Sequence, residues 1–164
     1  VYGSALILRD PTGRYKLLLD RMDSRVPEVR RQRLEGKLDM LMRRSGALRS
    51  FFVEWDIMTI GRICLELITL CLKVTALLDD IPFDPRKRLF RTALRGRLGQ
   101  QVEGKMYELF SCLGTLGKMC DDSDLASFAF PDVLSEVVNV LSKEASRQGF
   151  RVGLESPDRR HIER

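Results

Sequence analysis

The residues of this sequence that are best suited to bind a ligand form a run of positive charge between residues 86 and 97. Arginine donates paired hydrogen bonds to carboxylate and phosphate groups, so such a run favours an anionic partner. Arg88, Arg91 and Arg95 recur at helical spacing and predict one basic helix face, with apolar side chains on the other. The run has no acidic residue, and its cationic members are Arg86, Lys87, Arg88, Arg91, Arg95 and Arg97.

A second basic cluster, Arg30, Arg31 and Arg33, precedes this run. If the two clusters continue into one stripe, they could neutralise the phosphates of a nucleic acid. Binding to a protein would instead pair one basic patch with exposed apolar residues. A plain solvated face, and a bias toward arginine (21 arginines against 7 lysines), are simpler explanations that the sequence leaves open. We expect an acidic protein surface as the partner, with sequence-tolerant RNA or other nucleic acid, of viral or eukaryotic origin, as the alternative.

Residues for catalysis are scarce. The single histidine, His161, lies in a polar C-terminal segment, where a catalytic triad or a multi-histidine metal site would have no structured pocket. The sequence has none of the motifs typical of serine hydrolases, phosphate-binding loops, zinc proteases or dinucleotide-binding folds. The acidic pairs at 79–80 and 121–122 fit loop and helix-cap chemistry. The sequence therefore predicts a non-enzymatic protein without catalytic residues, cofactor or metal, and leaves an enzyme that uses carboxylates, lysine or arginine as the third alternative.

The four cysteines, Cys64, Cys71, Cys112 and Cys120, form no CxxC pair. Cys64 and Cys71 lie seven residues apart in an apolar segment and share one helix face. This spacing is typical of small buried side chains, and it fits neither zinc ligation nor a disulfide scaffold well. Reduced cysteines favour an intracellular location, cytoplasmic or nuclear.

The N-terminal residues carry the only predicted strands. Apolar runs at 5–8 and 15–19 flank residues 10–13, whose Asp-Pro-Thr-Gly order is typical of a tight turn. We therefore expect a β-hairpin over residues 1–20, packed against helices.

Most of the following chain has apolar residues at helical spacing. The first helix is expected to begin with Pro27 in its first turn and to stop near Gly46. Segment 47–78 is apolar around most of its circumference, which predicts a central helix. A break near Gly61, which would give two helices in place of one, is the alternative. Arg62 and Glu66 are spaced to form an ion pair. They belong to one narrow polar stripe, which consists of Arg62, Glu66, Thr69 and Lys73.

A further helix is expected to begin with Asp84 as its N-cap, with interruptions at Gly96 and Gly99, and a second helical run to end near Gly117. The segment Gly96-Arg97-Leu98-Gly99 resembles the GXXG loop of RNA-binding KH domains, but the strands which that fold requires are not predicted. We therefore interpret these glycines as a helix break or a close helix contact. The last helix starts at Pro131, ends at Gly149 and has an apolar stripe of Leu134, Val137, Val138, Leu141 and Ala145.

The whole chain of 164 residues, with 44% hydrophobic residues and a net charge of +5, fits one globular domain. We predict a mainly α fold, a bundle of about five to seven helices with a small N-terminal β-hairpin. The domain spans 1–151, with helices over 25–150, and a polar flexible tail follows at 152–164. Charges within the longest apolar run argue against a membrane span. The expected function is that of an interaction or regulatory domain, part of a larger protein, with self-association left open.

Overall fold

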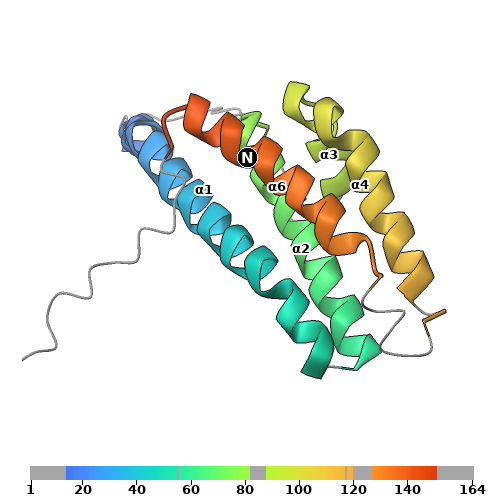
Figure 1. The fold of residues 1–164 in the computed structure, drawn as a ribbon. Helices are drawn as coiled ribbons and strands as arrows, with labels where there is room; N and C mark the ends of the chain where they lie inside the picture. The colour runs from blue at the N-terminus through green and yellow to red at the C-terminus, as the bar shows by residue number, and fades with distance from the viewer. Residues whose placement is uncertain (1–13, 55, 82–87, 117, 120–126, 151–164) are drawn as a thin grey trace, which may run out of the picture.

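The computed structural model describes residues 14–54, 56–81, 88–116, 118–119 and 127–150, and the first helix has described side chains at 27–49 and 52. These ranges contain five helices: α1 (Arg14–Glu54), α2 (Ile57–Leu78), α3 (Leu89–Ala93), α4 (Arg97–Leu116) and α6 (Phe130–Arg147). The four long helices lie alongside one another as a bundle, and α3 lies beside one end of α2 (Figure 1). The predicted mainly helical class is confirmed.

Helix α2 is the centre of the bundle, as predicted for the apolar segment 47–78, but residues 47–54 of that segment belong to α1. It packs against α1, α3, α4 and α6. Its buried side chains include Ile60, Leu67, Ile68 and Val74. Because a helix that is apolar on most sides must be covered on most sides, α2 requires the other helices around it. The core therefore forms around one continuous apolar segment.

The expected β-hairpin is wrong over residues 15–19, because α1 begins at Arg14 and these residues are helical. The other predicted strand and the turn lie outside the described residues. A short apolar run fits a strand or a helix equally well, so its neighbours decide between them. Here the helix continues through Pro27, which removes only one backbone hydrogen bond from a helix of 41 residues.

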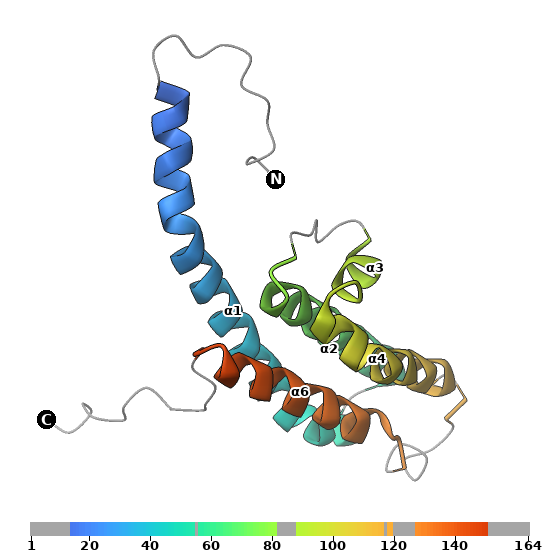
Figure 2. The ribbon, with the colours of Figure 1, turned by 90° about the horizontal axis from the view of Figure 1, so that it is seen from above.

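Helix α1 also passes Gly46, where a stop was expected. Its buried residues Leu34, Leu38, Leu41 and Leu48 are spaced by four, three and seven residues, which keeps one stripe against the bundle past the glycine. Forty-one helical residues span about 60 Å, whereas the 22 residues of α2 span about 33 Å. The first turns of α1 therefore extend beyond the other helices (Figure 2).

The boundary between α1 and α2 lies at Asp56, and the break considered at Gly61 is wrong because Gly61 is inside α2. The carboxylate of Asp56 accepts hydrogen bonds from the backbone N–H groups of Met58 (2.9 Å) and Thr59 (3.0 Å). These are two of the N–H groups that a helix start leaves without a backbone partner. An aspartate cap thus sets the boundary, while glycine is tolerated within the packed helix.

Helix α6 has the predicted apolar stripe and the predicted end. All five stripe residues are buried. Gly149 has a φ of 80°, the left-handed conformation that suits glycine. The N–H groups of Phe150 and Gly149 donate to the carbonyls of Ala145 and Ser146, both at 3.0 Å. This pair of bonds is a Schellman motif, so the C-cap prediction is confirmed.

The two glycines at 96 and 99 allow α3, α4 and the end of α2 to meet closely. A Cβ atom on Gly96 would lie 2.0 Å from Asp79 Oδ2, and one on Gly99 would lie 2.0 Å from the carbonyl oxygen of Ala93. The Asp79 carboxylate accepts hydrogen bonds from the N–H groups of Leu98 (3.1 Å) and Gly99 (3.0 Å). Asp79 therefore caps α4 from α2. The predicted break is confirmed at Gly96, which lies between α3 and α4, and close packing is confirmed at both glycines. The interruption expected at Gly99 is wrong, because Gly99 lies inside α4.

Candidate functional site

Two of the arginines singled out in the sequence hold helices together. Arg30 donates to the carbonyl oxygen of Leu77 (2.7 Å) and pairs with Asp80 (2.8 Å), so it satisfies the C-terminal end of α2. Arg97 pairs with Glu144 (2.6 Å) and thereby joins α4 to α6. Both guanidinium groups are already used within the chain.

The other candidate arginines have different surroundings. Arg31 pairs with Glu35 one turn later on α1, at 3.0 Å. Arg33 is exposed on the same helix. Arg91 and Arg95 are also exposed, and neither forms an ion pair with any residue that the structure describes. Arg86 and Lys87 lie outside the described residues.

The expected continuous basic helix face is not formed. Helix α3 has only five residues, so Arg88 precedes it and Arg95 follows it. Arg88 has a φ of 54°, a left-handed backbone conformation that places it outside the helix. A single phosphate-binding stripe through both clusters would need Arg30 and Arg31 to face the phosphates. Both arginines instead pair with carboxylates of the same chain.

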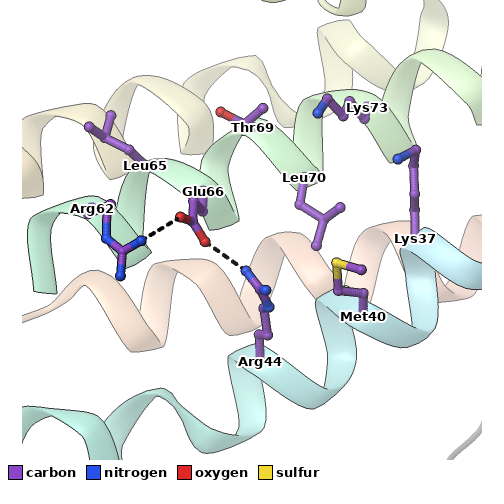
Figure 3. Close-up of a pocket in the computed structure, with 9 residues that line it drawn as sticks. All are labelled: Lys37, Met40, Arg44, Arg62, Leu65, Glu66, Thr69, Leu70 and Lys73. Atoms are coloured by element: carbon purple, nitrogen blue, oxygen red, sulfur yellow. Dashed lines mark hydrogen bonds and ion pairs between the residues drawn. The ribbon is translucent and has the colours of Figure 1, made fainter. Parts of the chain in front are cut away.

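An open groove between α1 and α2 holds a different set of charges (Figure 3). It has a volume of about 350 Å³. Met40 and Leu70 face each other near its middle, one from each helix. The lining residues, which we call the α1–α2 groove, are Lys37, Met40, Arg44, Arg62, Leu65, Glu66, Thr69, Leu70 and Lys73.

Positive charge dominates the α1–α2 groove, with four cationic side chains and one carboxylate. Glu66 is shared between Arg44 (2.7 Å) and Arg62 (3.6 Å), which confirms the predicted pairing of Arg62 with Glu66. At the other end, Lys37 and Lys73 form no ion pair within the described part of the chain. Partial burial lowers the pKa of Lys37, and the nearby charges of Lys73 and Arg33 lower it further. Two neighbouring ammonium groups therefore lie at this end of the groove.

Apolar side chains are exposed beside these charges. Leu65 is 50% exposed and Met40 is 46% exposed, although large apolar side chains of this kind are usually buried. Met58, one turn before Arg62 on α2, is 80% exposed. The stripe of Arg62, Glu66, Thr69 and Lys73 that the sequence shows is one wall of the groove. The sequence analysis did not identify Lys37, Met40 and Arg44 of α1 as part of this site, because no sequence pattern indicates which helix packs against α2.

The described cysteines are core residues, as their spacing indicates. Cys64, Cys71 and Cys112 are buried and free. Burial raises the pKa of Cys71 to about 12, and burial together with the neighbouring Cys112 raises the pKa of Cys64 to about 12. Thiols of this kind are poor nucleophiles, because the thiolate is the reactive form. No group of three or more potential metal ligands lies together in the described part of the chain.

Comparisons of the chain with known protein families, curated protein sequences and solved structures found no match. Among the described helices, none has the length and apolar character needed to cross a bilayer. The functional interpretation of the α1–α2 groove therefore depends on the geometry and charges of the groove alone.

Proposed function

We propose that this chain is a non-enzymatic interaction domain that binds an acidic protein partner through its basic helical surface. The observation that carries the proposal is the α1–α2 groove, where two lysines without an ion-pair partner among the described residues lie beside half-exposed apolar side chains. Protein interfaces combine desolvated apolar contacts with charges that guide and orient the partner. A carboxylate placed between Lys37 and Lys73 would relieve the repulsion between their ammonium groups.

Binding to single-stranded RNA has weaker support. Sequence-tolerant RNA sites combine a basic track with exposed aromatic rings on which bases stack. The lining residues of the α1–α2 groove in the described part of the chain include no aromatic one. On the other side of α2, the ring of Phe90 packs edge-on against Tyr107 (5.4 Å) and Phe110 (5.3 Å). Tyr107 and Phe110 are exposed, but they do not line the α1–α2 groove.

The proposal can be tested by titrating the labelled protein with poly-L-glutamate and, separately, with single-stranded poly-uridine RNA at about 150 mM salt. We expect binding to poly-L-glutamate that weakens as salt increases, and weaker binding to RNA. Tighter binding to RNA, abolished in a folded Arg88→Glu/Arg91→Glu/Arg95→Glu variant, would overturn the proposal in favour of a nucleic-acid site. No binding to poly-L-glutamate at low salt would also contradict it.

A further inference from the structure

Resting on the proposed function, we infer that the α1–α2 groove binds an amphipathic α-helix of the partner, with acidic residues beside its apolar stripe. The inference adds the shape, the charge pattern and the position of the ligand. It follows from the backbone of the groove, from its charges and from its apolar centre.

The walls of the groove determine that the occupant is a helix. Both walls are helices, so their backbone N–H and C=O groups already bond within each helix. An extended segment would find no backbone partners there, and its own polar backbone groups would lose water without compensation. A helix satisfies its own backbone and presents only side chains, as in other helix-in-groove complexes.

The order of side chains along the groove determines the charge pattern. Lys37 and Lys73 lie at one end, Met40 and Leu70 in the middle, and the Arg44–Glu66–Arg62 cluster at the other end. The two ends of the α2 wall, Arg62 and Lys73, are about 16 Å apart along the helix. A complementary helix of about three to four turns has a carboxylate near each end and large apolar residues between them.

A second copy of this chain fits the groove less well. An occupant with free carboxylates is needed, but many described acidic side chains already pair with arginine or lysine of the same chain. Examples are Glu35 with Arg31, Asp39 with Arg43, and Glu136 with Lys105. Self-association through these carboxylates would break their existing pairs, so we assign the groove to a different protein.

The test uses the full chain and a fluorescent peptide of about 16 residues, with leucines at helical spacing and glutamates beside them. Two matched peptides replace the glutamates by lysine or disrupt the leucine spacing by scrambling. We expect the acidic amphipathic peptide to bind at least about tenfold more tightly than either control. Methyl NMR signals of Met40, Leu65 and Leu70 are expected to shift on binding, while those of buried Leu109 on α4 stay unchanged.

Variants of the protein locate the site. Lys37→Glu/Lys73→Glu is expected to weaken the acidic peptide at least about tenfold and to strengthen the lysine peptide. Leu65→Ser is expected to weaken the acidic peptide through lost apolar contact. Arg91→Glu/Arg95→Glu makes the same change in charge away from the groove and is the matched control. Circular dichroism checks folding, and Lys37→Gln/Lys73→Gln replaces the double glutamate variant if that one unfolds.

The outcomes separate this inference from the proposed function. If Arg91→Glu/Arg95→Glu abolishes binding and the groove variants do not, an acidic partner still binds but the groove assignment is wrong. If the scrambled peptide or poly-L-glutamate binds as tightly as the amphipathic peptide, the helical ligand is wrong. If no acidic polypeptide binds the folded protein, the inference and the proposed function both fail.

Discussion

At the scale of single residues, Gly99 shows how tightly the helices meet. The position that a side chain would occupy lies 2.0 Å from the carbonyl oxygen of Ala93, which is backbone and cannot rotate away. Gly104, five residues further along α4, has no described atom from another part of the chain within 4 Å of the same position. Close packing thus requires glycine at position 99 of α4, whereas position 104 has space for a side chain.

We predict that Gly99→Ala destabilises the protein by about 2 kcal/mol or more, because α3 and α4 must separate to admit the methyl group. The matched control, Gly104→Ala, is expected to stabilise it by about 0.5–1 kcal/mol, since alanine restricts the unfolded chain and favours the helix. Urea denaturation measures both changes. Equal effects of the two substitutions would contradict the close contact described at Gly99.

At the scale of helices, Glu144 links α6 to α4 through an ion pair with Arg97. It is only 8% exposed, and its carboxylate accepts hydrogen bonds from Arg97, Arg147 and Gln148. Gln148 also donates to the carbonyl oxygen of Leu78, which brings the end of α2 into the same network. The hydrogen bonds from Arg147, opposed by burial and aided by Gln148 and the charge of Arg97, lower the pKa of Glu144 from 4.5 to about 2.

Because the folded state lowers this pKa, the stabilisation is complete above about pH 4.5 and is lost as the pH falls toward 2. We predict that Glu144→Gln lowers the free energy of unfolding near pH 7 by about 1–2 kcal/mol, a value reduced by solvent screening of the exposed guanidinium groups. Denaturation curves from pH 7 to pH 2 should show the two proteins converging at the acidic end. If the two free energies of unfolding differed by the same amount across this range, the charge of the Glu144 carboxylate would not contribute to the contact between α4 and α6.

At the scale of the whole molecule, the core forms around α2, and Cys64 and Cys71 are fully buried in it. Their thiols contact no solvent and have raised pKa values. Neither can react with an alkylating reagent until the bundle opens. These cysteines therefore report on unfolding of the whole bundle.

We predict that iodoacetamide labels Cys64 and Cys71 in the native protein at least about a thousandfold more slowly than in urea, because labelling waits for unfolding. Peptide mapping by mass spectrometry distinguishes the cysteines. A Met58→Cys variant supplies the control, since this position on the same helix is 80% exposed and its thiol should react rapidly. Fast native labelling of Cys71 would show that α2 is not enclosed as described.

Local patterns in the sequence predicted those features that depend on a few neighbouring residues. The apolar stripe and glycine end of α6, the central position of α2, the pairing of Arg62 with Glu66 and the packing role of Gly96 and Gly99 all agree with the structure. Each is set by helical periodicity, by the left-handed conformation that glycine allows at Gly149, or by the missing Cβ atom of Gly96 and Gly99. The polar wall of the α1–α2 groove was visible for the same reason.

Only the tertiary structure decided where α1 begins and ends, and which charges are free. Gly46 stays within α1 because the stripe of Leu34, Leu38, Leu41 and Leu48 packs along the bundle, and residues 15–19 form the first turns of the same continuous helix. Arg30 and Arg97 look like surface charges in the sequence, yet they bind partners about 47 residues away. Lys37 and Lys73 acquire their common site only when α1 lies against α2. Periodicity identifies the face of a helix that is buried, but the packing of the helices determines what lies opposite that face.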